Sequence, residues 1–328
     1  MMLRNTRCFA AGGCRVMLGL PVLAFMVVIG DAACSSEDGQ DAPVGEAEPN
    51  AAGSHEHEQA ETPPSAGDEA AETRWLSYRQ RFAIIVMGGS VPPNSRHYGW
   101  YWNDTFKMYN QLKDLGFTDE NIRFLSYGPN AREHDTAVDA TSTVDNIRAA
   151  YQWAARVCTK DDLLYIYWVD HGNQSSFEAH GELLGHHELG KLTAPIRARQ
   201  IVGAFNPCFS GAVIDDLSRK GVITITSQDA RHGNSWGWAG KWRQALRGGS
   251  EDDPSDANGD GEVTFAEAYR WIAVKSQAAG EHSMYDDNGD GTGSECGSAG
   301  FNPENPERDG CVGAHCSLRA WRPWPARE

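Results

Sequence analysis

The chain has 328 residues, which at about 150 residues per domain allows one or two domains. Its composition, 40% apolar and 23% charged, is ordinary for a soluble protein of enzyme size. Eight cysteines are too few for a small disulfide scaffold, and the net charge of −16 argues against a nucleic-acid-binding protein, because phosphate binding needs clustered Lys and Arg.

Residues 1–33 have the pattern of an export signal. Three arginines precede an apolar run over residues 16–30, which is too short for a bilayer span of about 20 residues. Small residues followed by Cys34 resemble a bacterial lipobox, so we expect a lipidated Cys34 and an outer-membrane lipoprotein of the cell envelope. Ordinary cleavage near Ala32, giving a secreted protein, and an uncleaved anchor are the alternatives.

Residues 34–73 read as a spacer. They contain eleven Asp or Glu residues, no Lys or Arg and no aromatic residue. Such a segment cannot bury enough apolar surface to offset the entropy lost on ordering. We therefore predict a disordered acidic tether that joins the membrane anchor to a folded domain over residues 74–328.

The first part of this domain alternates between strand and helix patterns. Continuous apolar runs, typical of strands buried on both faces, predict the strands Phe82–Met87, Ile122–Tyr127, Asp162–Val169, Gln200–Phe205 and Gly221–Thr226. Between them, helical spacing predicts Asn103–Leu115, Ser142–Cys158, Leu184–Leu192 and Gly211–Lys220. The alternation predicts an α/β fold, a mostly parallel sheet with helices on both faces. In such sheets the ligand crevice lies at the C-terminal ends of the strands.

Two of these strand ends carry nucleophilic chemistry. The third strand is followed by His171 and Gly172, and the fourth by Cys208 and Gly211. If the strands are neighbours, the imidazole and the thiol project into one crevice, where the imidazole and a helix N-terminus would favour the thiolate. The two glycines would let backbone amides approach a substrate carbonyl. A buried structural cysteine and a turn histidine are the alternative interpretation.

These motifs resemble a known family. The block Tyr165–Val169 running into Asp-His-Gly, and a second block running into Cys-Phe-Ser-Gly at 208–211, are similar to the legumain and caspase-like cysteine peptidases. The segments 101–122 and 208–217 are similar to its bacterial branch, and the resemblance covers about residues 80–295. It implies a caspase–haemoglobinase fold with Cys208 as nucleophile, His171 as general base or acid, and the amides of Gly172 and Cys208 as oxyanion donors.

The resemblance also suggests a specificity residue. Where legumains carry an arginine that binds the substrate's Asn or Asp side chain, an ungapped overlay places Asp104. A carboxylate there would attract Arg or Lys at the residue before the cleaved bond. Cleavage after Asn or Asp, and a plain helix-start carboxylate at Asp104, are the alternatives.

Residues 256–267 fit the twelve-residue EF-hand calcium loop. Gly261 supplies the sharp turn at position 6, and the oxygen donors at positions 1, 3, 5, 7, 9 and 12 are Asp256, Asn258, Asp260, Glu262, Thr264 and Glu267. We predict bound calcium here, within the peptidase domain rather than in a separate EF-hand domain. An acidic turn is the alternative.

A second acidic string repeats part of this pattern. Asp286, Asn288 and Asp290 stand at positions 1, 3 and 5, followed by a glycine at position 6. Position 12 falls on Gly297, so the bidentate carboxylate is missing. The sequence leaves open whether this loop holds calcium or is only polar.

Besides Cys34 and the nucleophile, the exported part has four cysteines, enough for two disulfides. Of the three possible pairings we favour Cys311 with Cys316 and Cys158 with Cys296, and a zinc site formed by Cys311, His315 and Cys316 is the alternative. The sequence as a whole predicts an exported calcium-binding cysteine endopeptidase that hydrolyses peptide or protein substrates by acyl transfer. The rival hypothesis is an inactive caspase-like protein that acts as a calcium-dependent surface binding module.

Overall fold

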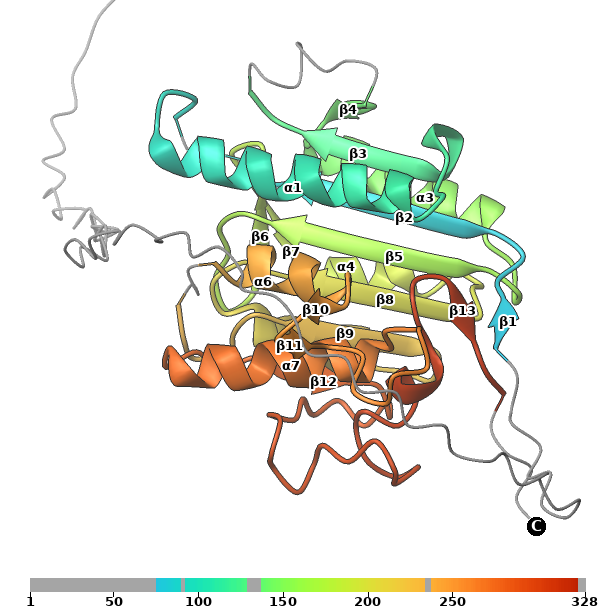
Figure 1. The fold of residues 1–328 in the computed structure, drawn as a ribbon. Helices are drawn as coiled ribbons and strands as arrows, with labels where there is room; N and C mark the ends of the chain where they lie inside the picture. The colour runs from blue at the N-terminus through green and yellow to red at the C-terminus, as the bar shows by residue number, and fades with distance from the viewer. Residues whose placement is uncertain (1–74, 90–91, 129–136, 234–236, 324–328) are drawn as a thin grey trace, which may run out of the picture. The chain divides into compact units, whose positions relative to one another are not determined.

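A mixed sheet of seven strands forms the centre of the structure (Figure 1), a computed structural model that describes residues 75–89, 92–128, 137–233 and 237–323. Its strands lie in the order β12-β9-β8-β5-β2-β3-β4. Every neighbouring pair is parallel except β12 with β9, which is antiparallel at one edge. The strands of this sheet are β2 (Arg81–Met87), β3 (Ile122–Ser126), β4 (Ala140–Thr141), β5 (Leu163–Val169), β8 (Gln200–Phe205), β9 (Val222–Thr226) and β12 (Met284–Asp286).

Helices cover both faces of this sheet (Figure 1). One apolar cluster joins the sheet to α1 (Arg96–Asp114), α6 (Trp238–Ala245) and α7 (Phe265–Ala278). A second cluster, on the other face, joins it to α3 (Val144–Val157), α4 (His186–Thr193) and α5 (Ile214–Leu217). The predicted α/β class, a mostly parallel sheet with helices on both faces, is therefore confirmed.

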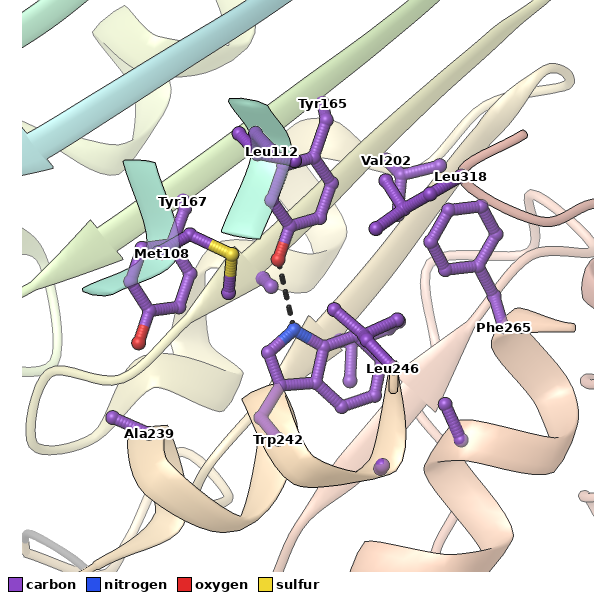
Figure 2. Close-up of a cluster of buried hydrophobic side chains, with 14 of the residues drawn as sticks. Met108, Leu112, Tyr165, Tyr167, Val202, Ala239, Trp242, Leu246, Phe265 and Leu318 are labelled. Carbon is purple, nitrogen blue, oxygen red and sulfur yellow. Dashed lines mark hydrogen bonds between the residues drawn. The ribbon is translucent and has the colours of Figure 1, made fainter. Parts of the chain in front are cut away.

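Aromatic side chains pack among aliphatic ones in the first cluster (Figure 2). Tyr165 of β5 and Trp242 of α6 are both fully buried, and the indole Nε1 donates a hydrogen bond to the tyrosine hydroxyl at 2.8 Å. This bond satisfies two polar groups that would otherwise be costly to bury. It also fixes α6 against the central strand.

Three short antiparallel pairs lie outside the main sheet. They are β1 (Leu76–Ser77) with β13 (Ala320–Trp321), β6 (Ser176–Ala179) with β7 (Glu182–Gly185), and β10 (Gly249–Ser250) with β11 (Asp253–Pro254). The 3₁₀ turns are η1 (Asp119–Asn121), η2 (Ser210–Val213) and η3 (Gly313–His315). All the described residues belong to one unit spanning residues 67–328.

The strand order reverses between β2 and β5. From β2 the chain moves outward to β3, then crosses back over β2 to β5 and continues through β8 to β9. Such a switch point opens a crevice beyond the C-terminal ends of the two strands. The ends of β2 and β5 therefore mark the expected ligand site.

The predicted helices differ from the observed ones at three places. The first helix begins at Arg96 rather than at Asn103, because the Ser95 side chain caps it by accepting the amide of Tyr98 at 3.1 Å. The predicted helix Gly211–Lys220 is wrong in length, since only η2 and the four-residue α5 form there. The predicted helix at residues 184–192 begins at His186, after the unpredicted hairpin β6–β7.

The predicted disulfides are also wrong, because all five described cysteines are free thiols. Cys158 belongs to the apolar cluster with α3, whereas Cys296 packs against the cluster on the opposite face, so the sheet separates them. Cys316 Sγ faces Gln200 Oε1 at 3.8 Å instead of Cys311.

The predicted signal at residues 1–33, the lipidated Cys34 and the tether at 34–73 lie outside the described residues. None of the helices in the described ranges is both long and apolar enough to cross a bilayer.

Candidate active site

Two neighbouring strands carry His171 and Cys208 to the same edge of the sheet. β5 and β8 pair in parallel, and their last pair is Trp168 with Phe205. The carbonyl of Trp168 also accepts the amide of Asn206 at 2.9 Å. His171 and Cys208 each lie three residues beyond that last pair. The expectation that these two strand ends are neighbours is therefore confirmed.

Gly172 packs tightly against the turn that carries Cys208. A Cβ atom at this position would lie 3.0 Å from the carbonyl oxygen of Cys208 and 2.8 Å from Cβ of Pro207. It would also lie 2.9 Å from the ring of Phe177. Real Cβ atoms need more room than this, so only glycine lets the backbone after His171 contact the backbone of Cys208.

Asp170 fixes the backbone that carries His171. Its carboxylate is buried and accepts two amides, that of Gly89 at 2.6 Å and that of His171 at 2.7 Å. The residue has a φ of 140°, a conformation that non-glycine residues rarely adopt. Burial raises the pKa of this carboxyl above its ordinary value, while the nearby His171 opposes the rise. Asp170 thus ties the end of β2 to the turn that holds the histidine.

Tyr101 packs against the histidine ring from α1. The two ring centroids are 5.6 Å apart and the planes are nearly perpendicular, at 88°. Burial raises the pKa of the Tyr101 hydroxyl, and the charges of Asp170 and Cys208 raise it further. This tyrosine therefore borders the histidine of the predicted dyad. Residue spacing alone reveals no role for Tyr101 or Asp170, because their contacts depend on how α1 and β2 pack.

The turn after Cys208 is anchored on both sides. Phe209 adopts a left-handed conformation, with φ of 57°, and its amide donates to the carbonyl of His232 at 2.9 Å. The hydroxyl of Ser210 accepts the amide of Gln228 at 3.3 Å. Cys208 itself is half-buried.

The expected long helix behind the thiol does not form. η2 begins at Ser210 and runs for only four residues before the four-residue α5. A helix dipole acts through aligned peptides, so such short turns give the Cys208 thiolate little stabilisation. The expected contribution of a helix N-terminus to the Cys208 thiolate is therefore small.

The Gly172 amide points away from the hairpin beside it. Gly172 forms an isolated bridge with Phe177, and the flanking hydrogen bonds run from Asn173 N to Ser176 O and from Glu178 N to His171 O. In an antiparallel ladder, the residues between such bonds direct their own N–H groups outward. The Gly172 N–H group therefore donates no hydrogen bond to this hairpin.

Asp104 lies one turn after Tyr101 on α1, where it forms an ion pair with Arg243 of α6 at 3.4 Å. Burial raises the pKa of the Asp104 carboxyl, whereas Arg243 and Lys107 lower it. The predicted specificity carboxylate is therefore partly neutralised by a guanidinium from the neighbouring helix.

The first acidic loop folds as a tight turn around its own carboxylates. Asp256 accepts the amides of Gly259 and Gly261 at 2.8 and 3.0 Å. Asn258 Oδ1 accepts the amide of Asp260 at 2.8 Å. Glu267 caps α7 through Thr264, and its Oε1 accepts the amide of Ala257 at 3.2 Å, so it closes over the start of the loop. These hydrogen bonds bring the carboxylate of Glu267, at position 12, to the amide at position 2.

The second acidic loop makes the same turn. Asn288 Oδ1 accepts the amide of Asp290 at 2.8 Å, and Asp290 Oδ1 accepts the amide of Thr292 at 2.8 Å. Three carboxyl groups in or beside this loop are almost fully buried: those of Asp286 and Asp287, at positions 1 and 2, and that of Asp309. Burial raises the pKa of each, to about 6, about 7 and about 6 respectively.

Both acidic loops lie at the end of the sheet opposite the predicted dyad. Glu262 accepts a hydrogen bond from Ser317 Oγ at 2.9 Å, and the adjacent carbonyl of Leu318 accepts one from Arg81, the first residue of β2. The amide of Gly291 donates to Ser218 Oγ at 2.8 Å, just before β9 begins. Among the described residues, no three His, Cys, Asp or Glu side chains already converge as a metal-binding group.

Comparison with known proteins adds no relative. No protein-family model matches the chain, and no curated protein matches it.

Proposed function

We propose that this chain is an exported cysteine endopeptidase of the legumain and caspase-like type, with Cys208 as nucleophile and His171 as its proton-transfer partner. One observation carries the proposal: β5 and β8 are neighbouring parallel strands, and His171 and Cys208 each lie three residues beyond their last residue pair. The mixed, mostly parallel sheet is compatible with a caspase–haemoglobinase fold. The proposal includes export and a lipid anchor at Cys34. The proposed substrate is a peptide or protein.

The proposed reaction is acyl transfer to the thiol. His171 takes the proton of Cys208, and the thiolate attacks the peptide carbonyl to give a tetrahedral intermediate. His171 then protonates the departing amine as the C–N bond breaks, which leaves a thioester. Water, deprotonated by His171, hydrolyses the thioester and restores the thiol.

Backbone amides would stabilise the negative charge that develops on the carbonyl oxygen. We assign this role to the amides of Gly172 and Cys208. The outward direction of the Gly172 amide and its close approach to the Cys208 carbonyl support the assignment. Asp170 acts as a positioning residue, because its carboxylate accepts the amide of His171.

Specificity for the residue before the cleaved bond remains assigned to Asp104. Tyr101, one turn earlier on α1, contacts His171, so this helix borders the dyad. Because Arg243 already pairs with Asp104, we expect a modest preference for Arg or Lys substrates, which Asp104→Asn removes. A fluorogenic peptide library varied at this position tests the assignment. A strong preference for Asn would place Asp104 outside the pocket.

We also propose that the loop at 256–267 holds calcium. Its donors are all oxygen atoms, which is the chemistry that calcium prefers: Asp256, Asn258, Asp260, the carbonyl of Glu262, Thr264 and Glu267. When bound, the ion would neutralise the loop's carboxylates and stabilise the folded state. The position of the loop at the far end of the sheet supports a structural role for the ion rather than one in the reaction.

Peptide hydrolysis by purified variants tests the proposed function. Cys208→Ala and His171→Ala should each abolish hydrolysis of a casein or fluorogenic peptide substrate while the melting temperature stays nearly unchanged. Cys296→Ala is the matched control, because Cys296 is also half-buried but has no role in the proposed reaction, and it should keep full activity. Persistent hydrolysis by the Cys208→Ala protein would refute the assignment and favour a binding protein without catalysis.

A further inference from the structure

The two acidic loops share one internal structure, 30 residues apart. In each, the Asn side chain at position 3 accepts the amide of position 5, at 2.8 Å in both loops. The carboxylate at position 5 accepts the amide of position 7, at 3.0 Å in the first loop and 2.8 Å in the second. The second loop therefore has the backbone of the first, although its sequence lacks a carboxylate at position 12.

Asp309 stands where the missing carboxylate would be. In the first loop, the carboxylate of Glu267 accepts the amide at position 2, Ala257, at 3.2 Å. In the second loop, Oδ1 of Asp309 accepts the equivalent amide, that of Asp287, also at 3.2 Å. Asp309 comes from a segment 23 positions beyond Asp286, so the twelve-residue pattern does not reveal it.

Asp286 is buried without compensation. It is fully inaccessible to solvent, and neither of its oxygens has a hydrogen-bond partner within bonding geometry, although the Ser218 hydroxyl and the Gly289 amide lie near it. In the first loop the equivalent Asp256 accepts two amides. Here one of the corresponding amides, Gly291, donates to Ser218 instead, which leaves the Asp286 carboxylate available.

No basic side chain neutralises this group. In the described part of the chain, no Lys, Arg or His forms an ion pair with Asp286, Asp287 or Asp309. The carboxylate of Asp287 already has hydrogen-bond partners, because its two oxygens accept the amides of Gly310 and Gly313 at 3.0 and 2.7 Å. Burying an unpaired carboxylate is costly unless it is protonated or binds a cation.

We propose that Asp286, Asn288, Asp290 and Asp309 form a second calcium site, in which Asp309 supplies the carboxylate that the loop sequence lacks. The carbonyl of Thr292, at position 7, is a further candidate donor. The side chains do not yet converge on one point, so Asp309 and Asp290 must rotate towards Asp286 when the ion binds. The bound calcium ion would connect three parts of the chain: the segment around residue 309, the edge strand β12 and the turn before β9. The site does not depend on the proposed peptidase activity.

Calorimetric titration of the full chain with calcium chloride, after removal of bound metal by chelator, tests the proposal. The Glu267→Gln variant, which disables the first loop, should still bind one calcium ion. Adding Asp309→Asn to that variant should weaken the remaining binding by about tenfold or more, because one ligand charge is lost. Asp290→Asn, at an exposed position, should do the same without loss of folding.

Glu307→Gln is the matched control, because it removes one exposed negative charge two residues before Asp309. It should leave both the stoichiometry and the affinity unchanged. Far-ultraviolet circular dichroism in chelator verifies that each variant is folded. If Glu267→Gln binds no calcium, or if adding Asp290→Asn and Asp309→Asn leaves its binding unchanged, the proposal is wrong.

Discussion

Gly172 and Cys208 touch through their backbones. The space at Gly172 is so limited that a methyl group there would lie 3.0 Å from the Cys208 carbonyl oxygen. This contact joins the turns that follow two paired strands, and each turn carries one member of the proposed dyad. The relative position of the imidazole and the thiol is thus set by backbone packing as well as by side-chain contacts.

Gly172→Ala should therefore damage the site. The added methyl group would force the two turns apart, so we expect hydrolysis to fall by about tenfold or more and stability to fall by about 1–3 kcal/mol, as in an overpacked core. Gly99→Ala is the control, because a Cβ there meets no atom within 4 Å and Gly99 lies inside α1. That change should stabilise the protein by about 0.5–1 kcal/mol. Equal activity in the two variants would show that the close approach has no catalytic role.

Asp170→Asn should weaken the turn that carries His171. The carboxylate accepts amides on both oxygens, from Gly89 and from His171. An Asn side chain has one acceptor, so its NH₂ group would face one of these donors at a cost of about 1–3 kcal/mol. We expect lower stability in urea unfolding and a slower reaction of Cys208 with iodoacetamide. An unchanged reaction rate, with the stability loss present, would show that Asp170 supports the fold but does not position the histidine.

Calcium should raise the melting temperature without changing the chemistry. An ion that binds only the folded state stabilises it by about 2.7 kcal/mol at a concentration one hundred times its Kd. Both loops lie at the sheet end away from the dyad, so kcat/KM at a temperature where both forms are folded should stay within about twofold. Differential scanning fluorimetry of wild type and Glu267→Gln, with calcium and with chelator, checks this. Identical curves for the wild type in both buffers would exclude a functional calcium loop.

His186 should make the protein less stable in acid. Burial lowers the pKa of this histidine to about 4, below the value of about 6.5 expected in the unfolded chain. At pH values between about 4 and 6.5, His186 binds a proton more readily in the unfolded chain than in the folded protein. The stability contribution of neutral His186 is therefore complete above about pH 6.5 and is lost as the pH falls towards 4, by up to about 3 kcal/mol.

Replacing His186 by Phe should flatten this part of the stability profile, measured by urea unfolding from pH 7 to pH 4. Phe is suitable because His186 already packs against the ring of Phe177, with centroids 4.5 Å apart. The neighbouring His187 is exposed, so His187→Phe should leave most of the slope in place. If His186→Phe keeps the wild-type slope, other groups cause the acid sensitivity.

The central strands could be predicted because each is buried on both faces and so forms an unbroken apolar run. Gln200–Phe205, for example, was predicted at its observed bounds. Helix ends were harder, because Gly99 weakens the helical pattern near the start of α1, and the Ser95 cap is a local contact. The helix predicted from Gly211 does not form at its predicted length, because the apolar residues there are buried by two short turns, η2 and α5.

The predicted site was recognisable only in part. His171 and Cys208 each follow an apolar strand, so the sequence predicts a shared location only if the two strands are neighbours, and the pairing of β5 with β8 meets that condition. Tyr101, Asp170 and Asp309 reach the proposed sites through contacts between distant segments, which residue spacing does not reveal. Asp309 in particular lies outside any twelve-residue window that begins at Asp286.

The most direct test of the proposed dyad is the rate at which each cysteine reacts with iodoacetamide near pH 6.5, measured by mass spectrometry of peptides. Among the described cysteines, Cys208 and Cys296 are the two that are not buried, and burial raises the pKa of Cys296. A thiol paired with an imidazole forms thiolate at this pH, so Cys208 should react at least about tenfold faster than Cys296. His171→Ala should abolish the difference. Equal rates for the two cysteines in the folded wild type would contradict a catalytic Cys208–His171 dyad.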